Sequence, residues 1–273
     1  MTGFDFMERT LKKIIAVDDV NFFLLSIKQK LQDHYKIYSA QSAENLFEIL
    51  QIIKPDLILL DINMDGVDGF ATIEKLKSDA QFVDIPVIFL TSRSAREDIF
   101  NAFSLGAVGF LTKPFSTEKL LINIEKQLDS ELLEANKSVI LAIDDCPSIL
   151  KSINHALNKR YKVHTLLEPE KMEEILKTIT PDLFLLDYKM PVLNGFELVP
   201  IIRSLPAHEA TPIIFLTSEA TVDNISAAIH YNCDFAVKPV NKVVLHKKIA
   251  KQLANFMMRQ HMEEDLRSAL CKN

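Results

Sequence analysis

Two nearly identical apolar heptapeptides, each ending in an aspartate, constrain this chain most. PDLILLD occupies Pro55–Asp61 and PDLFLLD occupies Pro181–Asp187, 126 residues apart and different at one position. Each is an apolar run of strand length that brings one carboxylate to its end. Because the segment recurs at the spacing of a whole compact domain, we interpret the chain as a duplication that carries two copies of one site.

Other residue pairs recur at nearly the same distance, which extends the duplication over most of the chain. These are Asp18-Asp19 with Asp144-Asp145, Thr91-Ser92 with Thr217-Ser218, and Lys113-Pro114 with Lys238-Pro239, the last pair one residue closer. The total length of 273 residues fits two domains. We expect domains over residues 1–130 and 137–256, followed by a C-terminal helical extension over 257–273.

Short apolar runs alternate with stretches whose apolar residues have helical spacing. We expect strands at Lys13–Val17, Ile37–Ser39, Leu57–Leu60, Pro86–Leu90, Val108–Leu111, Val139–Ile143, Val163–Thr165, Leu183–Leu186, Ile213–Leu216 and Phe235–Val237. We expect helices near Val20–Asp33, Ala43–Ile53, Phe70–Ser78, Ala95–Leu105, Thr117–Glu134, Ser148–Asn158, Glu170–Thr178, Phe196–Leu205, Val222–Tyr231 and from Lys242 onward. The alternation predicts in each half a parallel sheet covered by helices on both faces.

The segments that join and follow the two halves are helical in pattern. The join near Asp129–Ser138 is charged and lacks proline and glycine, so we expect the last helix of the first half to continue into it. After the second half too few residues remain for another folded domain. Two interpretations of this tail stay open, a dimerisation helix and a long helix that packs on its own domain.

Composition excludes several classes of protein. A net charge of −6 argues against a general nucleic-acid surface. No apolar run approaches the roughly 18 residues that span a bilayer, and the N-terminus lacks the apolar core of a signal peptide. Three cysteines without a pairing pattern predict no disulfides and no structural zinc. We therefore expect a cytoplasmic protein that acts without membrane or nucleic acid.

The candidate site lies where the predicted strands end, because function collects at this edge of a parallel sheet. In the first half the edge receives three carboxylates, one hydroxyl and one ammonium: Asp18, Asp19, Asp61, Thr91 and Lys113. The second half places the same groups there: Asp144, Asp145, Asp187, Thr217 and Lys238. Adjacent carboxylates repel one another unless a cation lies among them, and hard oxygen ligands suit Mg²⁺. Since the lysine and hydroxyl can hold phosphoryl oxygens, the pattern predicts phosphoryl transfer to the central aspartate.

In these residues the chain resembles two receiver domains of two-component response regulators, over roughly residues 11–128 and 137–256. The resemblance implies two flavodoxin-like (βα)5 domains, each with a five-stranded parallel sheet of order 2-1-3-4-5. It implies that Asp61 and Asp187 accept phosphoryl groups, and that each domain binds one Mg²⁺. The implied metal ligands are Asp18, Asp19, Asp61 and the carbonyl of Asn63, and in the second copy Asp144, Asp145, Asp187 and the carbonyl of Lys189.

The resemblance also implies roles for the remaining site residues. Thr91 and Thr217 are the switch hydroxyls, and Lys113 and Lys238 contact the phosphoryl group. Three positions before each lysine, the aromatic side chains that rotate on activation in this family correspond to Phe110 and Phe235.

The two copies depart from the family pattern in different ways. The first reads DINMDGVDG, with Asp65 where the family has proline, and the second reads DYKMPVLNG. In the second copy Asn232-Cys233-Asp234 replaces the usual Gly-Ala with one residue fewer in the segment. Two positions that tune dephosphorylation in the family hold Asn63 and Arg93, and in the second copy Lys189 and Glu219. Because Lys189 and Glu219 can pair and restrict an attacking water, we expect unequal phosphoryl lifetimes.

The favoured function is a tandem receiver that takes phosphate from a histidine kinase or a histidine phosphotransfer protein. It catalyses only its own phosphorylation and dephosphorylation, and it signals to a downstream protein partner by a conformational change. We expect any homodimer to form through the fourth-helix to fifth-helix face or the C-terminal helix. Two alternatives stay open: a regulatory part of a larger response regulator whose output domain, for example a cyclase or kinase, is absent, and an aspartyl-phosphate phosphatase. The Asp-x-Asp signature expected of that phosphatase is absent.

Overall fold

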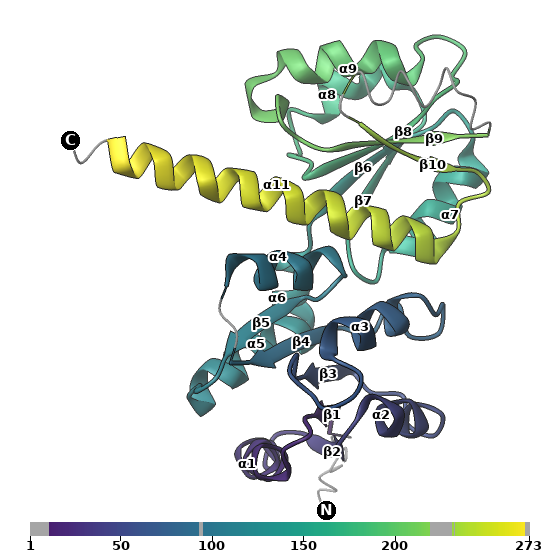
Figure 1. Ribbon diagram of the computed structural model, residues 1–273. Helices are drawn as coiled ribbons and strands as arrows, with labels where there is room; N and C mark the ends of the chain where they lie inside the picture. The colour runs from purple at the N-terminus through teal and green to yellow at the C-terminus, as the bar shows by residue number, and fades with distance from the viewer. Residues whose placement is uncertain (1–10, 93–94, 219–230, 232, 271–273) are drawn as a thin grey trace, which may run out of the picture. The chain divides into compact units, whose positions relative to one another are not determined.

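The chain forms two parallel five-stranded sheets, as the sequence predicts. The computed structural model describes residues 11–92, 95–218, 231 and 233–270, the last ten of these by their backbone alone. Strand order is β2-β1-β3-β4-β5 in the first sheet and β7-β6-β8-β9-β10 in the second (Figure 1). Both orders are the expected 2-1-3-4-5. Within the described ranges no helix is long and apolar enough to cross a membrane.

The first sheet follows the predicted elements closely. Its strands are β1 Lys13–Val17, β2 Lys36–Ala40, β3 Leu57–Leu60, β4 Val87–Thr91 and β5 Gly109–Thr112, and its helices are α1 Asn21–Leu31, α2 Ala43–Leu50, α3 Gly69–Lys77, α4 Arg96–Ser104 and α5 Thr117–Leu128. Strands β3 and β4 are buried at every residue, which explains their unbroken apolar sequence. On one face the sheet packs against α1 and α5, and on the other Phe70 of α3 contacts Phe89 of β4.

The second sheet repeats the arrangement. Its strands are β6 Val139–Ile143, β7 Lys162–Leu166, β8 Leu183–Asp187, β9 Ile213–Thr217 and β10 Asp234–Val237, with helices α7 Pro147–Leu157, α8 Met172–Ile175, α9 Gly195–Ser204 and α11 Lys242–Leu270. Short 3-10 turns, η1 Pro169–Lys171 and η2 Pro206–His208, precede α8 and follow α9. One apolar cluster joins the sheet to α7 and α11, and a second joins its other face to α8 and α9 (Figure 1). Both faces are therefore covered.

Two predicted helices differ from the structure. The helix expected over Thr117–Glu134 is interrupted at Asp129, which has an extended backbone, and a separate helix α6 spans Ser130–Asn136. The Asp129 carboxylate accepts hydrogen bonds from the backbone N–H groups of Glu131 and Leu132, so it caps α6 instead of continuing α5. The expectation of one continuous helix through the join was wrong.

The helix expected over Glu170–Thr178 is shorter than predicted. The described structure has the 3-10 turn η1 followed by the four residues of α8. Pro169 begins this segment and sets the first turn. The helix expected over Val222–Tyr231 falls almost wholly outside the described residues.

Contacts divide the chain into two compact units, each built around one sheet. The first contains residues 1–74, 85–95 and 107–133, and the second contains 75–84, 96–106 and 134–273. Two stretches expected in the first domain, 75–84 and 96–106, thus group with the second unit. The domain bounds of 1–130 and 137–256, with the extension over 257–273, stay a prediction.

Candidate functional site

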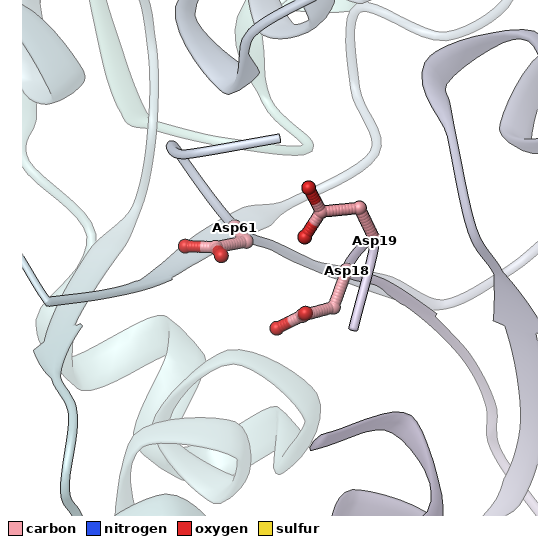
Figure 2. A group of neighbouring side chains, drawn as sticks. All are labelled: Asp18, Asp19 and Asp61. Atoms are coloured by element: carbon pink, nitrogen blue, oxygen red, sulfur yellow. The ribbon is translucent and has the colours of Figure 1, made fainter. Parts of the chain in front are cut away.

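The first copy gathers three carboxylates at the carboxyl ends of two neighbouring strands (Figure 2). Asp18 and Asp19 follow β1, and Asp61 follows β3. One carboxylate oxygen of each lies within 4.8 Å of the others. Asp18 and Asp61 are buried, whereas Asp19 is half-buried. The adjacent pairing of β1 and β3 explains why residues more than forty positions apart meet here.

Lys113 connects two of these carboxylates. Its Nζ lies 2.6 Å from Asp18 Oδ2 and 3.0 Å from Asp61 Oδ2. The backbone N–H of Lys113 donates to the carbonyl of Thr91, 2.7 Å away, and so continues the pairing of β5 with β4. Thr91 is fully buried at the end of β4. The sequence-predicted acceptor, acidic pair, hydroxyl and lysine of the first copy therefore lie at one edge of the sheet.

The negative charge of Asp61, the predicted acceptor of the first copy, is only partly offset by its surroundings. Burial raises the pKa of Asp61 and the neighbouring charge of Asp18 adds to this, whereas the hydrogen bond and charge of Lys113 oppose it. Asp61 Oδ1 is buried and has no hydrogen-bond partner among the described residues. A buried carboxylate oxygen without a partner is unfavourable unless a ligand completes its environment. The three carboxylates therefore fit a hard divalent cation such as Mg²⁺.

The second copy reproduces this geometry. Lys238 Nζ lies 2.6 Å from Asp144 Oδ2 and 2.8 Å from Asp187 Oδ1. Burial, opposed by Lys238, raises the pKa of Asp187. Burial lowers the pKa of Lys238, but its bonds to Asp144 and Asp187 outweigh this and raise it. Thr217 is buried at the end of β9, and exposed Asp145 completes a second group of three carboxylates within 4.8 Å.

A glycine holds the loop beyond each acceptor against the strand. A Cβ on Gly69 would lie 2.2 Å from the carbonyl oxygen of Asp61, and one on Gly195 would lie 2.3 Å from that of Asp187. Neither distance allows a side chain, so the helix that follows can approach the acceptor only with glycine at its first residue. These are the glycines that end the DINMDGVDG and DYKMPVLNG segments.

The surroundings of the two acceptors differ. In the first copy the amide of Asn63 donates to Ser92 Oγ at 3.2 Å, and the backbone N–H of Asp65 donates to Asp19 Oδ2 at 2.8 Å. The corresponding Lys189 of the second copy is exposed. The structure adds Ser92 to the predicted set, and its recurrence as Ser218 was the available signal. Arg93 and Glu219, expected to influence dephosphorylation, lie outside the described residues.

The two expected switch aromatics occupy matching positions in the sheets. Phe110 on β5 pairs with Phe89 on β4, and Phe235 on β10 pairs with Phe215 on β9. Both Phe110 and Phe235 are half-buried. Their positions do not test whether they rotate on activation, so the switch role stays a prediction.

Comparison with known proteins agrees with this geometry. The model of the response regulator receiver domain matches residues 14–125 and again residues 140–250. The chain belongs to the response regulator receiver family. Receiver domains are signalling domains of two-component systems, and they interact with histidine kinases and downstream proteins.

Individual relatives match parts of this tandem receiver chain. Protein RcaC of Microchaete diplosiphon is 31% identical over 177 residues, which cover 63% of this chain and 26% of that protein. The heme response regulator HssR of Staphylococcus aureus (strain bovine RF122 / ET3-1) is 35% identical over 128 residues, covering 46% of this chain and 56% of that protein. The matched part of this chain therefore spans about a quarter of the length of RcaC and about half of the length of HssR.

A solved structure of the chemotaxis response regulator CheY4 of Vibrio cholerae also matches one part of the chain. The two are 29% identical with a TM-score of 0.42, and the match covers 44% of this chain and all of that one.

Proposed function

We propose that both receiver domains accept phosphoryl groups, on Asp61 and Asp187, with Mg²⁺ bound beside each acceptor. The observation that carries the proposal is the partly unpaired acceptor of the first copy. Asp61 gives one oxygen to Lys113 and leaves Oδ1 buried without a described partner, within reach of two further carboxylates. The second copy supports the same role through the matching contacts of Lys238.

The chain's own residues supply the positions and charges for the transfer. A carboxylate oxygen of Asp61 or Asp187 attacks phosphorus, the bond between phosphorus and the donor nitrogen breaks, and an acyl phosphate forms. Lys113 or Lys238 turns from the acceptor carboxylate to the phosphoryl oxygens, which Thr91 or Thr217 also contacts through its hydroxyl. Burial raises the pKa of each acceptor above that of an ordinary aspartate, so we expect transfer to slow as the pH falls through this raised pKa.

Bound Mg²⁺ would neutralise charge on the carboxylates and the transferring phosphoryl oxygens. Its ligands would be the acidic pairs, the acceptors and the carbonyls of Asn63 and Lys189.

Phosphorylation would then be read by a protein partner. The donor is a histidine kinase or a histidine phosphotransfer protein. Inward movement of Phe110 and Phe235 with the switch hydroxyls would alter the surface near the fourth helix of each copy. Phosphorylation would thus shift each domain between two conformations. Formation of a homodimer through the fourth-helix to fifth-helix face or through α11 would be one way in which phosphorylation is passed on as a signal.

Acetyl phosphate tests the proposal without a protein donor. We expect the native chain to be labelled when Mg²⁺ is present and to lose labelling when EDTA removes it. Asp61→Ala and Asp187→Ala should each remove the label of one acceptor and leave that of the other, and the double variant should retain none. Labelling of the double variant at the native level would show that other groups are modified and that the acceptor assignment is wrong.

A further inference from the structure

The second copy contains a cavity at the edge of its sheet opposite the acceptor. The cavity has a volume of about 670 Å³ and is lined by the end of α9, the loop that carries η2, the residues before β10, and α11. Pro212 in its wall directly precedes β9, whereas Asp187 ends β8, which pairs with β9 in parallel. The cavity therefore lies at the amino-terminal edge of the strands, away from the carboxylates. Its size is that of pockets that hold small organic ligands.

One wall of the cavity comes from a part of α11 that has no continuous counterpart in the first copy. By the 125-residue spacing of the two site lysines, Leu253 corresponds to Leu128, the last residue of α5. Helix α11 continues past this point to Leu270 (Figure 1). The lining residues beyond Leu253 include Asn255, Phe256 and Arg259, and the corresponding positions of the first copy, in the separate helix α6, hold Ser130, Glu131 and Glu134.

Two arginines give the cavity a positive charge. Arg203 lies near the end of α9, and its Nη1 donates to the carbonyls of His208 at 2.9 Å and Thr211 at 2.7 Å, which holds the guanidinium against the η2 loop. Its Nε and Nη2 carry three further N–H groups. Exposed Arg259 adds a second guanidinium from α11, and exposed Glu209 supplies the carboxylate in the lining. The balance favours an anion, and guanidinium groups bind phosphate oxygens well.

The remaining lining suits a flat ring with hydrogen-bonding edges. Tyr231 and Phe256 supply aromatic side chains, and Gln252 and Asn255 supply amides that both donate and accept hydrogen bonds. Burial raises the pKa of Cys233 to about 11, so its thiol stays uncharged and does not repel an anion. A planar base joined to a phosphate group matches both parts of the lining.

We propose that this cavity binds a nucleoside phosphate, with the phosphate on Arg203 and Arg259 and the base beside Tyr231 and Phe256. The site belongs to the second copy alone, because Glu131 and Glu134 replace the aromatic ring and the guanidinium in the first. Binding at this edge of the sheet does not require phosphorylation of either acceptor, so the inference stands apart from the proposed function.

Isothermal titration calorimetry of the full-length chain tests the inference. The probes are AMP, GMP, ATP and GTP, each with EDTA so that no Mg²⁺ carries a nucleotide to the carboxylate sites. Adenosine, guanosine and inorganic phosphate separate the contributions of base and phosphate. Arg259→Glu gives the wall the charge of the first copy. Lys251→Glu is the matched control, since Lys251 is exposed on the same helix but lies outside the lining.

We expect at least one nucleotide to bind in a ratio of one per chain with a Kd below about 1 mM. Arg259→Glu should weaken this binding by at least about tenfold, because it replaces a phosphate-binding cation by an anion. Lys251→Glu makes the same change in net charge and should leave the Kd within about twofold. The nucleosides and inorganic phosphate should each bind more weakly than the nucleotide. Circular dichroism of Arg259→Glu should match the native chain, as an exposed side chain is changed.

Absence of binding by all four nucleotides would overturn the inference. Binding that Arg259→Glu leaves unchanged would place the nucleotide elsewhere, and equal weakening by Lys251→Glu would attribute it to net charge; either result also rejects the site. Inorganic phosphate that binds as tightly as the nucleotide would show that the aromatic side chains take no part, and this too would contradict the proposal.

Discussion

At the scale of single residues, the acceptor aspartates are held in an environment that opposes their charge. Asp61 is 6% exposed, has an acidic neighbour and leaves one oxygen unpaired among the described residues. Its pKa is raised by burial, so the folded protein binds this proton more tightly than the unfolded chain does. The stability that follows is fully present below the ordinary value of 3.8 and is lost as pH rises through the folded pKa.

Asp61→Asn should therefore stabilise the protein at pH 7 without Mg²⁺, because the amide cannot ionise. We expect a gain of about 1 kcal/mol, the usual size for one buried polar group, shrinking toward zero below pH 3.8. Urea unfolding followed by circular dichroism at both pH values measures this. Asp33→Asn, at an exposed carboxylate, is the control. A gain of the same size at both pH values would attribute the effect to packing and not to ionisation.

The positions of the candidate site residues were predictable because each follows a strand that the sequence marks clearly, whereas their roles stay a prediction. Once parallel pairing is assumed, Asp18, Asp61 and Lys113 must meet at one edge. Which apolar residues of a helix remain exposed to solvent was not predictable in the same way. The sequence places Phe22 and Leu25 in an amphipathic helix, but only packing reveals that the sheet already uses other apolar residues of that helix and leaves these two in solvent.

At the scale of secondary structure elements, the loop after each acceptor depends on the absence of one side chain. Gly69 and Gly195 begin α3 and α9 in contact with the acceptor carbonyls, where a Cβ would lie within 2.3 Å of oxygen. A backbone carbonyl cannot move out of the way as the end of a flexible side chain can. The first residue of these helices therefore also fixes the position of the acceptor.

Gly195→Ala should destabilise the second copy by roughly 2 kcal/mol, as expected for overpacking, and should slow acetyl phosphate labelling of Asp187 while sparing Asp61. Site-resolved labelling and urea unfolding measure both effects. Gly66→Asn is the control, because Gly66 has a positive φ of 87° with open space around it, a conformation that asparagine accepts. Normal labelling of Asp187 in Gly195→Ala would show that the loop can move without disturbing the acceptor.

The helices that differ from prediction show where sequence patterns lose information. Residues 129–134 have good helix formers, so periodicity alone continues α5 through them. The break is decided by one side chain, since Asp129 can cap the next helix as well as extend the previous one. In the same way, the 3-10 turn at Pro169 shortens α8 although the apolar spacing of the segment is helical.

At the scale of the whole molecule, duplication has kept the geometry of the two sites and changed their surroundings. Strand order, lysine contacts and loop glycines are the same in both copies. The residues two positions after the acceptors are not. This difference lies where water approaches the acceptor, so it is expected to alter the rate of phosphoryl loss.

The phosphorylated copies should lose their phosphoryl groups at different rates. In the first copy Asn63 is neutral and its amide donates to Ser92 Oγ at 3.2 Å, so it brings no positive charge to the phosphoryl group. In the second copy Lys189 is a long exposed cation beside the acceptor, and its charge favours contact with phosphoryl oxygens that an attacking water would otherwise reach. We therefore expect phospho-Asp187 to outlive phospho-Asp61 by roughly three- to tenfold, a difference of about 1 kcal/mol in activation free energy.

Decay of each acyl phosphate can be followed in the full-length chain with Asp187→Asn or Asp61→Asn as the silent partner. Exchange of the two residues provides the matched control: Asn63→Lys should lengthen the lifetime at Asp61, and Lys189→Asn should shorten it at Asp187. Because acetyl phosphate loads both sites in this experiment, the result does not depend on a protein donor. Equal lifetimes at the two acceptors, or lifetimes that the residue exchange does not change, would show that other residues around the acceptors control water access.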